Sequence, residues 1–464
     1  MRAISLKNKR MEPWVITVIL TALLPLLPEY AAPFLAGGAL AAAYQDAKRH
    51  RRLFTVGPLG KIMLVYLVFL SLGIIYSRDA GSAFYSWIMW GVMLMLYVAL
   101  HTVLISRRRI DTALLGLSAA AGGVGALACI QYLMRVLFGF SGHLQVWYPL
   151  DSFLFKISPI NINLEVVGDR ACATFTNPNI MAQYLVMVIP FVALYAFTGE
   201  RTRLRMFSRA CLLLAVCGVA FSFSRGSYLA LLAIAAIFAV ANIRKLSLVL
   251  LTAFSALMVT PPAVFERLFS IRKTGASKPV TPSLDSALNT AGMLITGPGA
   301  DKAISERFQV WYLCLKSFLD HPLFGIGSGV GNTSSMLLAS SVNVPHAHNL
   351  VLQLLVEGGI IALGIFVFAG FKLLQGGIRL TRQTGESRRI GITVLAFIAG
   401  FCVNSMVEFP FFTPKLIGAF LLVLALGDAV CRLYLEQKVS PLADVVMPPV
   451  FRQHSDQVTI SRMK

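Results

Sequence analysis

The sequence is poor in charge for its length. Only 13% of its 464 residues are charged, whereas a soluble domain carries about a quarter, and 57% are hydrophobic. Apolar runs near the roughly 20 residues that cross a bilayer recur along the chain. The composition excludes a soluble globular protein and predicts an all-α polytopic membrane protein.

Acidic residues are scarce, with 21 Asp and Glu against 41 Lys and Arg. If the N-terminus is cytoplasmic, most of the basic residues fall in the connections on the cytoplasmic side, as the positive-inside rule expects. The main clusters are Lys48–Arg52, Arg107–Arg109, Arg201–Arg205, Arg244–Lys245 and Arg388–Arg389. We interpret them as topology signals and contacts with anionic membrane lipids, and expect no nucleic-acid partner.

Motifs for metals and cofactors are also missing. The chain has no Asp-x-Asp pair on the predicted external side, no His-x-x-Glu-His and no nucleotide phosphate loop. The glycine-rich segment 325–331 lacks dinucleotide spacing, and we interpret it as tight turns. The seven cysteines form no CxxC pair, although a disulfide between Cys172 and Cys314 remains open. We therefore predict no metal and no cofactor.

The apolar runs predict about twelve transmembrane helices and four regions of chain. Residues 1–262 hold nine spans with an external loop at about 140–178, and residues 263–347 form a large external loop with amphipathic helices. Residues 348–433 hold the last three spans, and 434–464 form a cytoplasmic tail. The predicted spans are 12–28, 31–46, 57–76, 83–105, 112–138, 179–198, 206–222, 227–242, 246–262, 348–370, 390–408 and 415–433.

The large external loop contains an amphipathic helix that ends before Pro322. Phe308, Trp311, Leu315 and Phe318 follow the 3–4 spacing of a helix face, with Arg307 on another face. This pattern predicts that one face of the helix docks on the membrane bundle while Arg307 projects from it.

His348 opens the predicted tenth span and is the candidate general base. Its position at the positive end of a helix disfavours the imidazolium, and a neutral imidazole accepts a proton from a hydroxyl. Asn349, Gln353 and Glu357 continue along one face of the span. Glu357 would lie about 13–14 Å below His348, so we expect a supporting role for it. The alternative is a capping or interfacial histidine without chemistry; His346 is a second candidate base.

The candidate anion site consists of arginines on the external side. Arg225 lies between two spans that are too close for a real loop, and arginine binds phosphate in a bidentate manner. The alternative for Arg225 is a side chain that reaches the lipid headgroups. Arg170, Arg267 and Arg307 add cations on the same side, and would bind a diphosphate if they converge.

In order and spacing, these motifs resemble those of the lipopolysaccharide O-antigen ligases, within the superfamily of O-antigen ligases and polymerases. The resemblance rests on Arg225 with Leu229, a long external loop, and then His348–Asn349 followed by Gly359. The stretch from Glu306 to Gly327 is also similar to the loop of that superfamily. By motif the likeness covers roughly residues 165–370.

The resemblance implies a GT-C-like, metal-independent, inverting glycosyltransferase at the periplasmic face of the bacterial inner membrane. The donor would be a glycan on undecaprenyl diphosphate and the acceptor a sugar hydroxyl of lipid A–core. The essential arginines of the family would correspond to Arg225 and Arg307, and its histidine to His348. An O-antigen polymerase or a protein O-oligosaccharyltransferase of the same superfamily remains an alternative. From another class, a secondary transporter also fits twelve helices.

Overall fold

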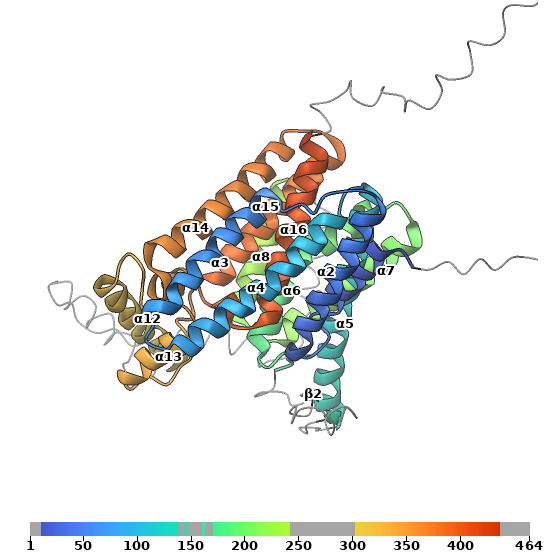
Figure 1. The fold of residues 1–464 in the computed structure, drawn as a ribbon. Helices are drawn as coiled ribbons and strands as arrows, with labels where there is room; N and C mark the ends of the chain where they lie inside the picture. Colours follow the sequence, from blue (N-terminus) through green and yellow to red (C-terminus); the bar gives the residue numbers. More distant parts are fainter. Residues whose placement is uncertain (1–10, 139–143, 147–159, 163–169, 242–301, 437–464) are drawn as a thin grey trace, which may run out of the picture.

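The computed structural model describes residues 11–138, 144–146, 160–162, 170–241 and 302–436, almost all of them helical (Figure 1). The first half contains α1 (Pro13–Leu23), α2 (Ala32–Arg49), α3 (Pro58–Tyr76), α4 (Ala80–Val103), α5 (Arg107–Phe138), α6 (Pro178–Thr198), α7 (Thr202–Phe221) and α8 (Arg225–Val240). The second half contains α12 (Lys302–Asp320), α13 (Val330–Ala339), α14 (Leu350–Thr381), α15 (Gly385–Ser405) and α16 (Pro414–Glu436). Short 3-10 helices are η1 (Glu29–Ala31) and η4 (Pro410–Phe412). The strands β1 (Leu144–Val146) and β2 (Ile160–Ile162) form an antiparallel pair.

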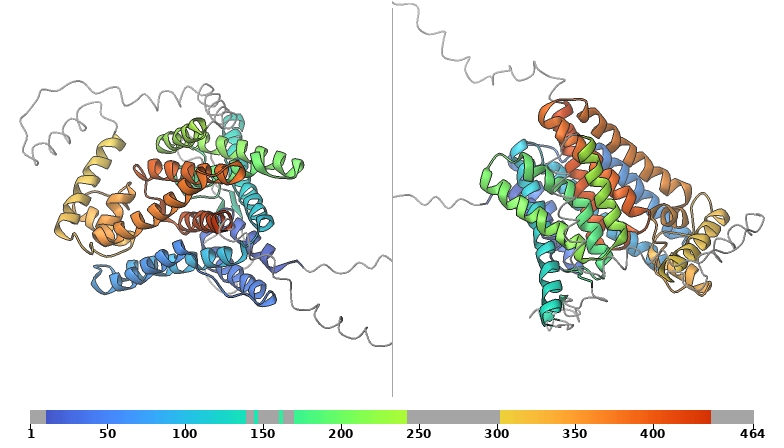
Figure 2. Two further views of the ribbon diagram at one scale, coloured as in Figure 1. Left: turned by 90° about the horizontal axis from the view of Figure 1, so that it is seen from above. Right: turned by 180° about the vertical axis from the view of Figure 1, so that it is seen from behind.

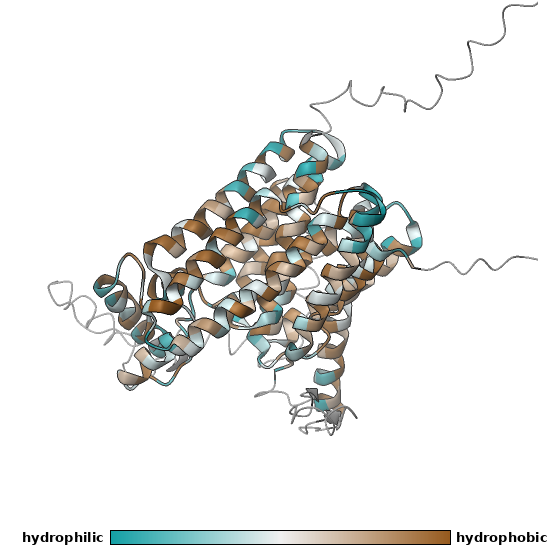
Figure 3. Cartoon of the chain, viewed as in Figure 1, coloured by the Kyte–Doolittle hydropathy of each residue, from teal (hydrophilic) through white to brown (hydrophobic). Residues whose placement is uncertain are grey.

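Seven of the described helices are long and apolar enough to cross a membrane: α3, α4, α5, α6, α7, α14 and α16. Figure 3 shows apolar residues along the middle of the long helices and hydrophilic residues toward their ends. The prediction of a helical, multi-pass membrane protein is therefore confirmed. Eleven of the twelve predicted spans coincide with described helices, and the span 246–262 lies outside the described residues. The total of twelve stays a prediction.

The bundle is built around α6 and α16. In an apolar stretch of 18 residues in each helix, 94% and 83% of the residues are buried. Helices α1–α4 lie on one side of α16 (Figure 2). On the other side α15 packs between α6 and α8, and α7 packs on α5 and α6. Helices α12 and α13 gather at one end of the bundle, where α12 packs on α14 and α13 on α4. This is the end at which α14 and α16 begin.

Helix α14 is interrupted at Gly359, whose backbone is not helical (φ 62°, ψ −159°). The segment 322–327 fills the break with its own backbone. The Ile326 N–H donates to the Val356 carbonyl (2.8 Å), and the Ile360 N–H donates to the Pro322 carbonyl (2.9 Å). Three glycines of the segment 325–331 adopt positive φ, as tight turns require. These bonds fix the position of the glycine-rich segment against α14.

The docked face of α12 differs from the predicted stripe. Val310 and Cys314 are fully buried, whereas Phe308 and Leu315 are about 40% exposed. The predicted stripe is therefore docked only in part: Trp311 packs against the buried cluster around Val310 and Cys314, whereas Phe308 and Leu315 stay outside it. Apolar residues occupy more than one face of this helix, and their spacing does not identify the face that packs against protein.

A buried ion cluster uses two of the basic clusters that we interpreted as topology signals. Asp46 has no exposed surface, and guanidinium nitrogens of Arg52 and Arg109 lie 2.5 Å and 2.6 Å from its carboxylate. A buried carboxylate is costly without such partners. These arginines therefore also join α2 to the start of α5.

Candidate active site

His348 lies directly before α14, outside its first turn. Asn349 is the N-cap: its Oδ1 accepts the Leu352 N–H (3.1 Å), and its Nδ2 donates to the Met406 carbonyl (2.9 Å). The helix thus begins at Leu350, two residues later than predicted. His348 itself has φ 50°, a left-handed conformation that few non-glycine residues adopt. Strained backbone of this kind is frequent at functional sites.

Glu408, between α15 and η4, is the direct partner of His348. Its Oε2 lies 3.0 Å from Nδ1 of the imidazole, and the residue is only 5% exposed. Burial acts to raise the pKa of Glu408, but the His348 hydrogen bond and the charges of His348, Arg307 and His346 outweigh it, so the pKa is lowered. Because a carboxylate only accepts, the neutral imidazole carries its proton on Nδ1 and presents Nε2 as the acceptor.

Arg307 reaches the same carboxylate from α12. Its guanidinium donates to Oε1 of Glu408 (2.8 Å), and Nδ2 of Asn179, at the start of α6, donates to the same oxygen (2.8 Å). The Arg307 side chain is 31% exposed. A guanidinium has five N–H donors, so this bond leaves others for an anionic ligand. Glu408 therefore joins a basic residue of α12 to His348.

Arg170 belongs to this network at one remove. Its Nε donates to the Ser222 carbonyl (2.7 Å), and its terminal nitrogen donates to Oδ1 of Asn179. Arg170 thus links the end of α7 to the side chain that bonds Glu408. Its predicted role as a diphosphate ligand stays a prediction, and Arg267 lies outside the described residues.

Arg225 is the first residue of α8 and lies beside the segment that carries the glutamate. The first turn of α8 packs on the end of α15, where Nδ2 of Asn404 donates to Oγ of Ser227 (2.9 Å). Gly226 approaches so closely that an added Cβ would lie 2.3 Å from Val407. These contacts hold the start of α8, and with it Arg225, next to the residue that precedes Glu408.

His346 differs from its neighbour in burial. It is 7% exposed, packs on the rings of Phe412 (centroids 4.9 Å apart) and His348 (4.3 Å), and its Nδ1 accepts the His348 N–H (3.2 Å). Burial, reinforced by the charge of His348, lowers the pKa of His346 to about 3. His346 is therefore neutral and supports the backbone. The His348 side chain is 24% exposed and has a carboxylate partner, so it is the better base.

Gln353 and Glu357 support the histidine from within α14. Oε1 of Gln353 accepts the Ala347 N–H (2.7 Å), and its Nε2 donates to Glu357 (2.7 Å). The indole of Trp311 donates to the Ala347 carbonyl (2.9 Å). Ala347, the residue before His348, is thus held through both its N–H and its C=O. Neither Gln353 nor Glu357 contacts the imidazole through these bonds.

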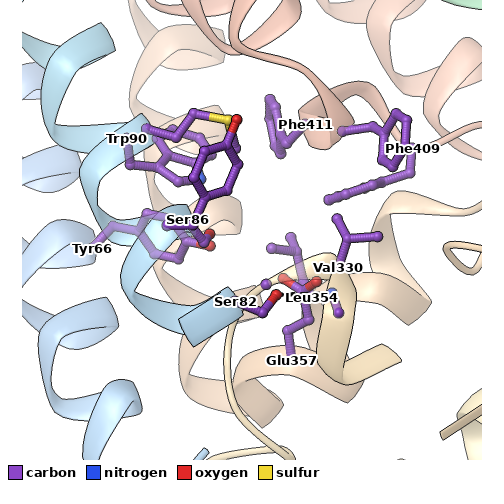
Figure 4. A pocket seen from close by; sticks show the side chains of 14 residues that line it. Tyr66, Ser82, Ser86, Trp90, Val330, Leu354, Glu357, Phe409 and Phe411 are labelled. Atoms are coloured by element: carbon purple, nitrogen blue, oxygen red, sulfur yellow. Dashed lines mark hydrogen bonds between the residues drawn. The ribbon is translucent and has the colours of Figure 1, made fainter. Parts of the chain in front are cut away.

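A cavity of about 280 Å³ lies on the other side of the phenylalanine rings that pack on His346 (Figure 4 shows its lining). Phe409 and Phe412 line it and also pack against His346. Its other walls combine aromatic and polar side chains from α3, α4 and α14, among them Tyr66, Trp90, Ser82, Ser86 and Glu357. An aromatic wall with a few hydroxyl and carboxyl groups is a common composition for binding a small polar ligand.

The described residues offer cationic groups and an imidazole for an anionic ligand. Within the described ranges, no group of three or more His, Cys, Asp or Glu side chains is placed to hold a metal ion. No disulfide joins Cys172 to Cys314. The sequence analysis did not identify Glu408 as a site residue. A lone acid between Val407 and Phe409, at the end of an apolar run, is nevertheless the kind of signal that identified His348.

The comparisons with known proteins fall on this part of the chain. A family model described as O-Antigen ligase matches residues 210–367. The match extends from α7 into α14 and includes Arg225, Arg307 and His348, whereas Arg170 and Glu408 lie outside it. No curated protein matches the chain.

Proposed function

We propose that this chain, a member of the O-antigen ligase superfamily, transfers a glycan from undecaprenyl diphosphate to a sugar hydroxyl of lipid A–core. The reaction would take place at the periplasmic face of the bacterial inner membrane. One observation carries the proposal: His348 and Arg307 bind the two oxygens of one buried carboxylate, Glu408. A base and a phosphate-binding cation are thereby held at one place.

His348 acts as the general base in this proposal. With Nδ1–H donating to Glu408, Nε2 accepts the proton of the acceptor hydroxyl as its oxygen attacks the anomeric carbon. The bond from that carbon to the diphosphate oxygen breaks, undecaprenyl diphosphate leaves, and the configuration inverts. Glu408 stabilises the imidazolium that forms, as a carboxylate does for a histidine base. General base catalysis of this kind contributes about 10²–10⁴-fold in rate.

Arg225 and Arg307 bind the diphosphate and stabilise the charge that develops on the leaving group. Guanidinium groups match phosphate oxygens in a bidentate manner, so they can take the place that a divalent cation has in other transferases. The salt bridge between Arg307 and Glu408 also couples donor binding to the base. A diphosphate that binds Arg307 would weaken the salt bridge from Arg307 to Glu408. Glu408 would then interact mainly with the His348 imidazole.

The aromatic cavity beside His346 supports a sugar as the acceptor. It is lined by aromatic rings, two serine hydroxyls and a carboxyl group, a set of groups that can stack on a sugar ring and hydrogen-bond its hydroxyls. We assign this cavity to the acceptor sugar next to the reacting hydroxyl. A protein acceptor would need an open groove for a chain segment.

Reconstitution with competing acceptors tests the proposal. The purified protein would receive a labelled glycan on undecaprenyl diphosphate together with lipid A–core, a second lipid-linked glycan and a pilin-like protein. We expect label on lipid A–core, lost in the His348→Ala variant. Label only on the lipid-linked glycan would indicate a polymerase, and label only on protein an O-oligosaccharyltransferase. Uptake of the glycan lipid by vesicles without any transfer would instead indicate a transporter.

A further inference from the structure

A second cavity, of about 540 Å³, lies at the opposite end of the bundle from His348. It is formed where α14 and α16 end and α3 begins. Three basic side chains line it: Lys372 and Arg379 from α14, and Arg432 from α16. None of these residues takes part in the candidate active site.

The cations at this cavity are available to a ligand. Lys372 and Arg379 are exposed, lie two helical turns apart on α14, and within the described ranges neither forms an ion pair. Arg432 uses one terminal nitrogen to bond the carbonyl of Leu104 (2.9 Å), which leaves its other N–H groups. Three positive charges therefore border one cavity.

Among the described residues, Asp428 is the one acidic residue that lines this cavity, and it is already engaged. Asp428 is 8% exposed and accepts a hydrogen bond from the Tyr97 hydroxyl (2.6 Å). Nε2 of His101 lies 3.6 Å from the same carboxylate oxygen. His101 is 2% exposed, lines the cavity, and its Nε2 has no hydrogen-bond partner among the described residues. Nδ1 of His101 donates to the Thr55 carbonyl (3.1 Å), so the attraction of this cavity for an anion comes from its three cations.

The backbone adds to the positive charge. Helix α3 begins at Pro58 on the wall of the cavity, with Gly57 as N-cap, and the Gly60 N–H of its first turn donates to the Tyr97 hydroxyl (3.0 Å). The start of a helix carries partial positive charge and binds anions, phosphate above all. The helix start and the three side chains thus favour the same kind of ligand.

We propose that this cavity binds a phosphate group, supplied by the phosphodiester headgroup of an anionic membrane lipid. Basic cavities between transmembrane helices bind such headgroups. Two large apolar side chains of α14 next to Lys372, Phe368 and Phe371, are about half exposed. They provide a surface for the acyl chains below the headgroup. The lipid would brace the ends of α14 and α16, and with them the helices that carry the active site at their other ends.

The test uses two variants of the full-length protein. Lys372→Gln/Arg379→Gln removes the two exposed cations of the cavity and leaves Arg432, which bonds the end of α4, in place. Arg382→Gln/Arg388→Gln is the matched control, because both arginines are exposed at the same end of the bundle but do not line the cavity. Each protein is stripped of lipid in detergent, and its folding is checked by its Tm and its elution volume.

Phosphatidylglycerol, phosphatidylcholine and inorganic phosphate are then titrated while Tm is measured. We expect phosphatidylglycerol to raise the Tm of the wild type and of the control variant, and phosphatidylcholine to have no such effect. One cation near an anionic lipid surface gives about a fivefold gain in affinity, so the double variant should need about 30-fold more phosphatidylglycerol. An equal effect of inorganic phosphate would keep the anion site but assign it to a soluble phosphate.

Two results would overturn the proposal: an unchanged response in the Lys372→Gln/Arg379→Gln protein, or no response to either anion in the wild type. The same titration on His348→Ala separates this site from the proposed function. We expect that variant to keep the full lipid response even if it transfers no glycan.

Discussion

His348 and Glu408 are separated by 60 residues in the chain, yet Nδ1 of the imidazole lies 3.0 Å from Oε2 of the carboxylate. The two residues come from separate segments, one before α14 and one after α15. Arg307 binds the other oxygen of the same carboxylate. The site therefore depends on the packing of three parts of the chain, and a change at Glu408 affects both the base and a cation.

Replacing Glu408 by Gln should lower the turnover of glycan transfer by about 10²-fold, within the range that general base catalysis contributes. The amide still accepts a hydrogen bond but no longer stabilises the imidazolium. If Glu408 only positions His348, KM for the donor should change little. The measurement is the initial rate of transfer against donor concentration, in parallel with the pH profile of kcat.

The control for this variant is Glu306→Gln, which changes an exposed acid next to Arg307. Transfer by that protein should stay close to the wild-type rate. If Glu408→Gln is as active as the wild type across the pH range, the carboxylate has no part in the reaction.

His348→Ala and Arg225→Ala should each abolish detectable transfer while leaving expression and membrane insertion intact. The first removes the proton acceptor and the second a fixed positive charge, each worth at least about 10²-fold. His321→Ala is the matched control, because His321 is exposed at the end of α12. The amount of glycan-modified lipid A–core measures the effect. Full activity of His348→Ala would exclude the base role.

Stability should fall as the pH drops below about 6.5, because His346 is held neutral in the folded protein. Its pKa is about 3 when folded and near 6.5 when unfolded, so the unfolded chain takes up the proton first. The contribution of His346 to the free energy of unfolding is fully present above pH 6.5 and is lost progressively as the pH falls toward 3. By pH 5 the loss amounts to about 2 kcal/mol.

The comparison that checks this effect is the wild type against His346→Asn, with Tm measured in detergent at pH 7.5 and pH 5. Asn can still accept the His348 N–H but does not titrate. Its Tm should change less between the two pH values. Burial acts to raise the pKa of Glu408, but the His348 hydrogen bond and the surrounding positive charges outweigh it and leave that pKa below its usual 4.5, so Glu408 acts in the same direction only at lower pH. Equal changes in Tm would contradict the assignment.

Gly359→Ala should destabilise the protein by several kcal/mol and reduce transfer. Its φ of 62° disfavours a side chain, and an added Cβ would lie 2.3 Å from the Leu323 carbonyl oxygen. Gly364→Ala, in the same helix with open space around it, should be neutral or stabilise by up to about 1 kcal/mol. Thermal unfolding of the two variants side by side is the measurement. A tolerated Gly359→Ala would mean that the break in α14 is not required.

The sequence determined the class of protein and which residues are costly in a membrane. Long apolar runs specify helices because the backbone must satisfy its own hydrogen bonds in lipid. His348 and Arg225 stand out because titratable groups are rare in such runs. Glu408 carries the same signal and was missed, because its importance depends on partners 60 and 101 residues away.

Only the tertiary structure decided which groups meet. The sequence does not distinguish His346 from His348. In the structure His346 is buried against Phe412, whereas His348 has the Glu408 carboxylate beside its ring. The packed face of α12 and the start of α14 at Leu350 were likewise set by neighbours and by the Asn349 cap. Hydropathy records how much each residue prefers to leave water. Contacts between distant segments depend on packing and on the pairing of buried polar groups, which no local pattern contains.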